Sequence, residues 1–291
     1  MVASAALAAP ENNSGGWGKV QGVKPDRKNL LVRIASALVA LPVVGVIVFW
    51  REPIGMTALC LVVAVQALRE YTSMTMAGRS WVERAGVVLI GAALYLALSL
   101  RPDLGVMWFL AALIAVAILV LVRAVDLPAA GARLFAAEFG VSYIGGLLAA
   151  LALLHSSPGP AWVALAIAVT FGNDTGAYFV GRAFGRHKLA PALSPGKTVE
   201  GALGGLVASL TVTFVAGWVF MPTLTTYDRV MIGLVASVVG PAGDLVESLI
   251  KRAAGVKDSG RCIPGHGGVL DRIDALLFVG AYVYLHFNLL R

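Results

Sequence analysis

Long apolar segments occupy most of this 291-residue chain, and they constrain its fold more than any other feature. Hydrophobic residues make up 58% of the sequence and charged residues only 13%, which lies outside the range of soluble domains. A helix needs about 20 mainly apolar residues to cross a bilayer core of roughly 30 Å. The sequence therefore predicts an all-α, polytopic integral membrane protein.

About nine segments are long and apolar enough to act as transmembrane helices. Their expected bounds are residues 32–50, 53–68, 86–100, 106–122, 134–154, 161–180, 201–220, 230–250 and 270–290. The second and third are the shortest, so one of them could be a re-entrant segment. Residues 1–30 lack a basic region before their apolar run and are interpreted as a flexible cytoplasmic lead, not as a signal peptide.

The distribution of basic residues predicts the orientation, because cytoplasmic loops collect Lys and Arg. With a cytoplasmic N-terminus and nine spans, all but four of the 23 Lys and Arg residues fall on the inner side. Eight or ten spans would place a basic loop on the wrong side. This topology, with anionic lipid headgroups, also accounts for the net charge of +7. No single basic stripe runs along the chain, so we expect no nucleic-acid partner.

Acidic residues occur at the inner ends of several predicted spans. Ionisable groups inside a span are costly unless they are paired or serve a site, so each is a functional candidate. Asp244, Glu247 and Ser248, followed by Lys251, are spaced to share one helix face, and Asp271 and Asp274 form a second polar stripe.

Two such stripes brought together would form an oxygen-lined pocket suited to Mg²⁺, with Asp244 and Asp271 as its ligands, and a second cation is left open. The alternative is that these acids form salt bridges with Lys251, Arg252 and Arg272 at the helix ends.

A second polar segment begins with Asn173 and Asp174 inside a span and continues through a basic loop to Gly205. Its run Ser194-Pro-Gly-Lys-Thr is too short for a Walker A loop. Hydroxyl groups, a lysine and the N-terminus of the following helix are nevertheless suited to a triphosphate. An ordinary basic inner loop is the alternative. The candidates here are Asp174, Arg182, Ser194, Lys197, Thr198 and Glu200.

A glycine-rich turn around His266 follows the first acidic stripe. We expect its backbone N–H groups, including those of Gly267 and Gly268, to be free to bind phosphate oxygens. His266 could be a catalytic base, a phosphate donor or a structural hydrogen-bonding residue. A zinc site is not supported, because His187, Cys262 and His266 lack a clear fourth ligand.

These motifs resemble the signature of the phosphatidate cytidylyltransferase family. The first match runs without a gap from Gly243-Asp244 through Lys251-Arg252 and Lys257-Asp258 to Asp271-Arg272-Ile-Asp274. The second runs from Asp174-Thr-Gly-Ala-Tyr178 to Glu200-Gly201 and departs at Val199, where the family often has an aromatic residue. The resemblance is strong over about residues 140–290 and rests only on hydropathy before that.

The resemblance implies CTP and phosphatidate as substrates, pyrophosphate as the product that leaves, and an active site on the cytoplasmic side of the cell's inner membrane. It divides the chain into residues 1–30, an N-terminal transmembrane part (31–135) and a C-terminal transmembrane catalytic region (136–291). A homodimer is left open. Two alternatives remain, a CTP-dependent lipid kinase and an ion-coupled transporter, although a transporter would place its acids near the midplane.

The expected roles combine the motifs with this resemblance. Catalytic roles are assigned to Asp244, Asp271, Lys251, Arg252, Lys257 and His266. Substrate-binding roles are assigned to Asp174, Arg182, Ser194, Lys197, Thr198, Glu200, Glu247, Asp258, Gly267, Gly268, Arg272 and Asp274. Positioning and charge stabilisation would dominate such a transfer, with the Lys and Arg side chains neutralising the triphosphate.

Overall fold

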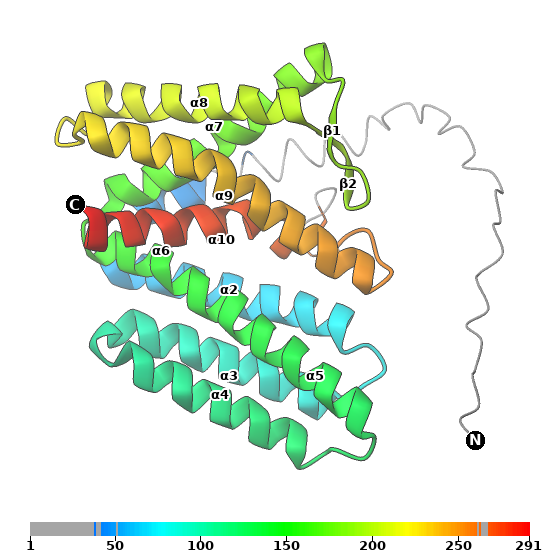
Figure 1. Cartoon of the computed structure of the whole chain (residues 1–291). Coiled ribbons are helices and arrows are strands. Elements are labelled where there is room, and N and C mark those ends of the chain that lie inside the picture. Colours follow the sequence, from blue (N-terminus) through cyan, green and yellow to red (C-terminus); the bar gives the residue numbers. More distant parts are fainter. Residues whose placement is uncertain (1–37, 39–41, 51, 261, 263–266) are drawn as a thin grey trace, which may run out of the picture.

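Eight helices in the described part of the chain are long and apolar enough to cross a membrane. The computed structural model describes residues 38, 42–50, 52–260, 262 and 267–291. Its helices lie side by side as a bundle (Figure 1). The prediction of an all-α, multi-pass membrane protein is confirmed, with the addition of one short two-stranded sheet.

The elements follow one another with short connections. In chain order they are α2 (Pro53–Thr75), α3 (Trp81–Leu100), the 3₁₀ turn η1 (Pro102–Leu104), α4 (Gly105–Leu121), α5 (Leu127–Gly140), the π-helical segment η2 (Val141–Gly146), α6 (Leu147–Ser156), α7 (Pro160–Phe184), β1 (Lys188–Ala190), β2 (Ser194–Thr198), α8 (Val199–Val219), α9 (Thr226–Ala253), α10 (Leu270–Leu285) and the π-helical segment η3 (His286–Leu290).

The predicted spans agree with these helices in number and order, except at the start of the chain. Residues 32–37 and 39–41 of the first predicted span, 32–50, lie outside the described residues, and 42–49 are helical. The second and third spans are longer than expected: α2 has 23 residues and α3 has 20, so both can cross a bilayer. The prediction stopped α2 before its charged residues, yet the helix continues past them because Glu70 is buried and hydrogen-bonded.

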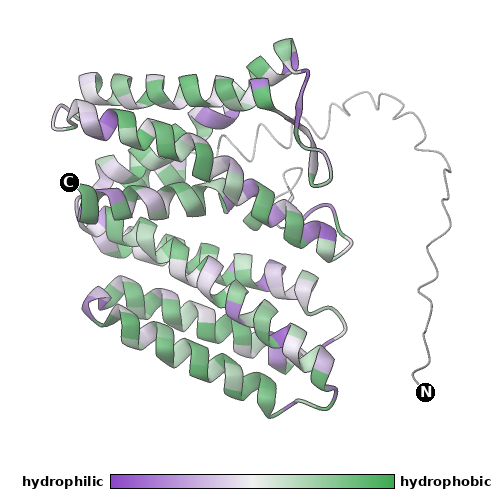
Figure 2. Ribbon diagram, in the orientation of Figure 1, coloured by the Kyte–Doolittle hydropathy of each residue, from purple (hydrophilic) through white to green (hydrophobic). Residues whose placement is uncertain are grey.

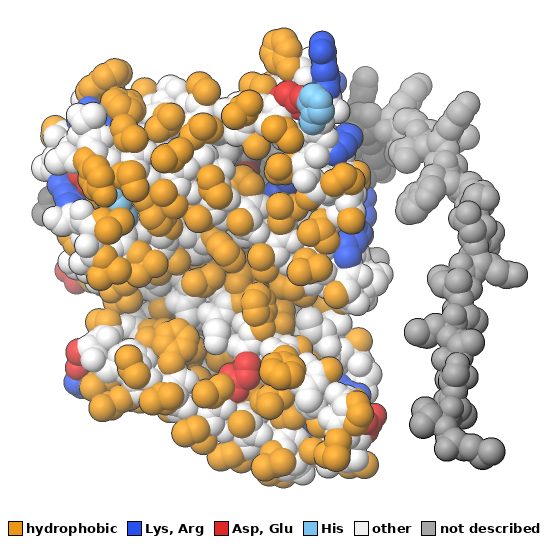
Figure 3. Space-filling view, in the orientation of Figure 1, with side chains coloured by type: hydrophobic (Ala, Val, Ile, Leu, Met, Phe, Trp, Pro, Cys, Tyr) orange, Lys and Arg blue, Asp and Glu red, His pale blue; other side chains and the backbone are white. Residues whose placement is uncertain are grey.

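Hydrophilic residues gather near the ends of the helices, while their lengths are mainly apolar (Figure 2). The C-terminal ends of α2, α7 and α9 lie at the same end of the bundle as the N-terminal ends of α8 and α10 (Figure 1). Lys and Arg side chains gather along this edge in Figure 3. The two polar motifs, far apart in sequence, are therefore brought to one end of the bundle.

Helices α7 and α8 pack closely because small residues face one another. A Cβ atom added at Gly204 would lie 2.9 Å from the carbonyl oxygen of Gly176 and against the side chain of Val180. Small residues at such contacts let two backbones approach within a membrane. The β1–β2 hairpin joins these helices, with Lys188 paired to Thr198 and Ala190 to Ser194. The start of α8 is thereby fixed beside the end of α7.

Candidate active site

A pocket of about 470 Å³ lies among α7, the hairpin, α8 and α9. Its size falls within the range of small-molecule sites. The charged residues that line it are Asp174 and Arg182 from α7, Lys197 from β2 and Asp244 from α9. Ser194 and Thr198 also line it. The structure thus brings five residues of the second predicted motif together with the first acid of the other motif.

Lys197 connects the hairpin to α9. Its ammonium group lies 2.8 Å from Asp244 Oδ2 and donates a hydrogen bond to the carbonyl oxygen of Pro241 at 3.2 Å. Pro241 lies inside α9 and has no N–H for the usual bond to the carbonyl four residues earlier. The other oxygen of Asp244 accepts a hydrogen bond from Ser248 at 3.3 Å. Both oxygens of Asp244 therefore have partners at the edge of the pocket.

Lys251 occupies a more enclosed position between two acids. Its ammonium group lies 2.5 Å from Glu247 Oε2 on the same helix and 2.6 Å from Asp271 Oδ1 on α10. The side chain of Glu247 is only 1% exposed, and that of Asp271 is 11% exposed. The acidic stripes predicted on α9 and α10 therefore meet, with a lysine between them.

The second oxygen of Asp271 is held by three donors. Asp271 Oδ2 accepts hydrogen bonds from the backbone N–H of Ser259 at 3.0 Å, the Ser259 hydroxyl at 2.8 Å and the N–H of Gly268 at 2.9 Å. These bonds fix the rotation of the carboxylate, so that Oδ1 faces Lys251. Any cation held by Asp271 would therefore meet Oδ1, at the position where Lys251 now lies.

The remaining acids lie nearby. Asp174 and Asp274 are close enough to Asp244 for their negative charges to interact. Asp274 Oδ1 also accepts a hydrogen bond from the N–H of Ala275 at 2.8 Å. The carboxylates of α7, α9 and α10 thus form one acidic cluster at this end of the bundle.

The glycine-rich turn differs from the sequence-based expectation. The N–H of Gly268 was expected to be free for a phosphate, and this was wrong, because it donates to Asp271. The next two N–H groups, of Val269 and Leu270, donate to Glu70 at 3.0 and 2.9 Å. Gly267 adopts a φ of +83°, a conformation that favours glycine. His266 lies outside the described residues, so its three expected roles stay open.

Glu70 was not identified from the sequence. It lies on α2, about 200 positions before its partners, and its side chain is buried. The predicted second span ended at residue 68, so Glu70 fell outside it, and no local pattern connects Glu70 to the start of α10. An acid directly beside an apolar segment was the available signal.

Glu200 is engaged in joining the hairpin to α8. It accepts hydrogen bonds from the backbone N–H groups of Arg186 at 3.0 Å and His187 at 3.2 Å, and it lies 2.6 Å from His187 Nδ1. Thr198 caps α8 by accepting from the N–H of Gly201 at 3.1 Å. Both residues therefore hold the framework of the pocket, and Thr198 also lines it.

The other candidates lie toward the surface. Arg182 donates to the hydroxyl of Tyr178 at 2.8 Å at the pocket lining. Arg252 points to the loop after α9, where it donates to the carbonyl oxygen of Val256 at 3.5 Å. The exposed candidates outside the pocket lining are Arg252, Lys257, Asp258 and Arg272. Their predicted roles would require a ligand that extends beyond the pocket.

The donor chemistry around Asp244 and Asp271 fits Mg²⁺. Within the described ranges, no group of three or more His, Cys, Asp or Glu side chains is arranged to hold a metal ion. Mg²⁺, however, usually takes one or two carboxylates and completes its shell with waters and substrate phosphates. The ammonium groups of Lys197 and Lys251 now contact the oxygens that would serve as ligands.

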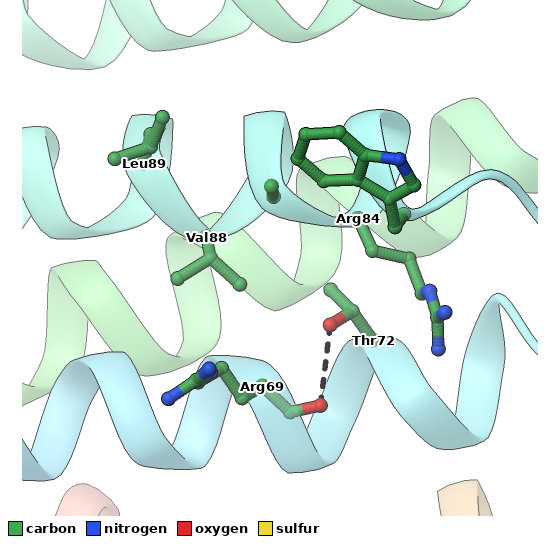
Figure 4. Close-up of a pocket in the computed structure, with 7 residues that line it drawn as sticks. Arg69, Thr72, Arg84, Val88 and Leu89 are labelled. Carbon is green, nitrogen blue, oxygen red and sulfur yellow. Dashed lines mark hydrogen bonds between the residues drawn. The ribbon is translucent and has the colours of Figure 1, made fainter.

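A separate pocket of about 400 Å³ lies between α2 and α3 (Figure 4). Arg69 and Arg84 line it, and their side chains extend in different directions in the figure. Thr72 donates to the carbonyl oxygen of Arg69 at 3.2 Å. Its described lining contains no carboxylate. The pocket among α7, the hairpin, α8 and α9, where two acids meet a lysine and an arginine, is therefore the better candidate for phosphate chemistry.

Comparison with known proteins gives a consistent result. The model of the cytidylyltransferase family matches residues 31–290. A phosphatidate cytidylyltransferase from Staphylococcus haemolyticus is 47% identical over 123 residues, which cover 42% of this chain and 47% of that protein. One from Bacillus subtilis is 45% identical over 126 residues, covering 43% of this chain and 47% of that protein. The chain thus spans about half the length of the curated relatives it matches.

Proposed function

Because the chain belongs to the cytidylyltransferase family, we propose that it transfers CMP from CTP to phosphatidate and forms CDP-diacylglycerol and pyrophosphate. The observation that carries this proposal is the joining of two motifs in one charged cluster at the end of an apolar bundle. A pocket of about 470 Å³ there combines Asp174 and Asp244 with Lys197 and Arg182. Such a site suits a nucleotide from the aqueous phase and a substrate whose acyl chains stay in the bilayer.

The reaction is a displacement at the α-phosphorus of CTP. A phosphate oxygen of phosphatidate forms a bond to that phosphorus, and the bond from it to the oxygen bridging toward the β-phosphorus breaks. Pyrophosphate leaves with the electron pair, so no covalent enzyme intermediate is required. The protein has to align the two phosphates and stabilise negative charge on the departing group.

The side chains of the cluster suit these two tasks. Asp244 and Asp271 would hold Mg²⁺, which when bound supplies positive charge to substrate phosphates. Lys197 and Lys251 would then exchange a carboxylate partner for phosphate oxygens. Arg182, at the pocket lining, retains further N–H donors beyond its bond to Tyr178.

We also propose that the site faces the cytoplasm from the inner membrane. CTP is a cytosolic nucleotide, and the basic residues of the chain concentrate on the side that would be cytoplasmic. The clustering of acids at one end of the bundle disfavours an ion-coupled transporter, whose binding site lies near the midplane. A lipid kinase that uses CTP remains the closest alternative chemistry.

The position of the transferred label tests the proposal. Purified protein in lipid bilayers is supplied with phosphatidate, Mg²⁺ and CTP labelled either at the α- or at the γ-phosphate. We expect label in the lipid only from α-labelled CTP, together with release of pyrophosphate. Label from γ-labelled CTP would indicate a kinase, with diacylglycerol added as its substrate in a parallel reaction. An absence of labelled lipid from both nucleotides would refute the assignment.

A further inference from the structure

A buried acid of the N-terminal half holds the start of α10. Glu70 is 5% exposed. Its Oε1 accepts hydrogen bonds from Gln66 Nε2 at 3.0 Å and from the N–H of Val269 at 3.0 Å. Its Oε2 accepts from the N–H of Leu270 at 2.9 Å and from the Ser259 hydroxyl at 3.3 Å. One carboxylate thus connects α2, the loop after α9 and the first turn of α10.

These contacts adjoin Asp271 directly. Leu270 precedes Asp271 in the chain, and the Ser259 hydroxyl that reaches Glu70 lies closer to Asp271 Oδ2, at 2.8 Å. That hydroxyl carries one proton, so the two carboxylates share a single donor. Gly268 completes the arrangement, because its N–H bonds Asp271 while its α-carbon faces Glu70. A Cβ added at Gly268 would lie 2.5 Å from Glu70 Oε2.

Local residues do not replace Glu70 in this role. Helices usually satisfy their first N–H groups with a side chain from the residue just before them. Val269 precedes α10 and provides no capping side chain. The carboxylate that accepts these N–H groups instead belongs to Glu70, in the other half of the chain, although a carboxylate inside a span is costly. If Glu70 served only to cap α10, it would not need to contact Ser259, the loop residue that also donates to Asp271.

We propose that Glu70 is a positioning residue for Asp271: it sets the rotation and height of the first turn of α10, and so the direction of Asp271 Oδ1 toward the reacting phosphates. This inference rests on the proposed function for the meaning of Asp271. The hold of Glu70 on the turn itself is independent of any activity.

Glu70→Gln tests the inference with little change in size. Both oxygens of Glu70 accept backbone N–H groups, so the amide NH₂ of glutamine must face one of these donors. We expect kcat to fall by about 10- to 100-fold, the usual range for residues that orient ligands, with a smaller change in KM for CTP. Amide hydrogen exchange of residues 267–275 should become faster. Gln66→Met, which removes one donor to Glu70, should lower kcat by a smaller factor.

Glu83→Gln is the matched control, because Glu83 is also a buried acid in the N-terminal half. Its ion pair is with Arg133 on α5 at 3.0 Å, and not with the loop or α10. We expect Glu83→Gln to reduce thermal stability while kcat per folded molecule and exchange in 267–275 stay near wild type.

The outcomes separate the two hypotheses. If wild-type protein makes labelled lipid but Glu70→Gln keeps wild-type kcat, the positioning role is refuted and the proposed function stands. If Glu70→Gln loses activity only in proportion to folded protein, as Glu83→Gln would, Glu70 is structural only. If wild-type protein makes no labelled lipid, the proposed function fails. In that case, unchanged amide hydrogen exchange of residues 267–275 in Glu70→Gln would also refute the claim that Glu70 holds the start of α10. Should Glu70→Gln fail to fold, a wild-type kcat in Gln66→Met counts against the inference.

Discussion

Replacing Lys251 with Met removes the ammonium group that contacts Glu247 at 2.5 Å and Asp271 at 2.6 Å. Methionine keeps most of the length and apolar contact of the lysine stem, so the substitution mainly deletes a charge. Sequence reasoning alone proposed a choice between a catalytic lysine and one that holds α9 against an acid. The structure places Lys251 between Glu247 and Asp271, and Asp271 is a proposed metal ligand, so under the proposed function the single substitution should affect stability and rate together.

The expected loss of stability follows from the burial of the two acids. Glu247 is 1% exposed and would be left with an uncompensated charge, which costs about 3–5 kcal/mol when one partner of a buried pair is removed. That is a large share of the roughly 5–15 kcal/mol that stabilises a typical folded domain. The double variant Lys251→Met/Glu247→Gln removes both charges and should regain most of this loss. Asp271 keeps its three donors to Oδ2 in both variants.

The rate should not recover with the stability. If Lys251 meets the triphosphate more strongly as charge develops on the leaving pyrophosphate, kcat and kcat/KM should fall together by on the order of 100-fold. This reduction should persist in the double variant, because the charge that meets the phosphate is still missing. Thermal unfolding and steady-state kinetics with α-labelled CTP, both on the same purified samples, measure the two effects.

A double variant that regains both stability and kcat would refute the catalytic role and leave Lys251 as a structural partner of Glu247. A stable variant with normal kcat but raised KM for CTP would instead identify a contact to the ground state. Glu247→Gln alone is the matched control, since it retains the Lys251 charge and its contact with Asp271.

Three further predictions concern the metal, the glycine turn and the topology. Asp244→Asn should abolish turnover in the folded protein, because it removes the charge of a proposed metal ligand. The stability of the protein should fall by only about 1 kcal/mol or less, because the ion pair of Asp244 is partly exposed. Activity within a few-fold of wild type would exclude Asp244 as a required ligand. Gly268→Ala should lower thermal stability and kcat, because its Cβ would overlap Glu70, and unchanged kinetics would show that the loop can move aside. A cysteine in 185–195 should react with impermeant reagents only from the cytosolic side and one at Ser157 only from outside; reversed labelling would overturn the topology.

The sequence predicted the helices and the face of each acid well, because both follow from local periodicity. Apolar length located the eight spans within the described residues, and three- and four-residue spacing correctly grouped Asp244 with Ser248 and Glu247 with Lys251. It also predicted that acids from several helices would gather at one end. The order of the charged residues along the chain is enough to predict this shared end, since neighbouring spans must alternate in direction.

The partners of the charged groups were less predictable. Lys197 and Asp244 belong to different motifs, and their contact at 2.8 Å depends on how the hairpin folds against α9. The hairpin itself was not foreseen, because Ser194 to Thr198 contains proline and glycine, which are uncommon in strands. Glu70 was missed for a different reason: its backbone partners lie about 200 positions away, and periodicity within one helix carries no information about them.

The way the site would bind anions therefore differs from the sequence-based view of a backbone cradle. The N–H groups of Gly268, Val269 and Leu270 are engaged with carboxylates. At the start of α8, the N–H of Val199 donates to His187 and that of Gly201 to Thr198.

Among the described residues of these two segments, charge for a triphosphate would then come mainly from side chains, above all the lysines that now contact Asp244 and Asp271. Lys251 can turn to a phosphate only if another cation takes its place beside Glu247 and Asp271, since an unpaired buried charge is costly. Lys197 can leave the partly exposed Asp244 at a smaller cost. Binding of nucleotide and of the divalent ion would thus be coupled mainly through Lys251.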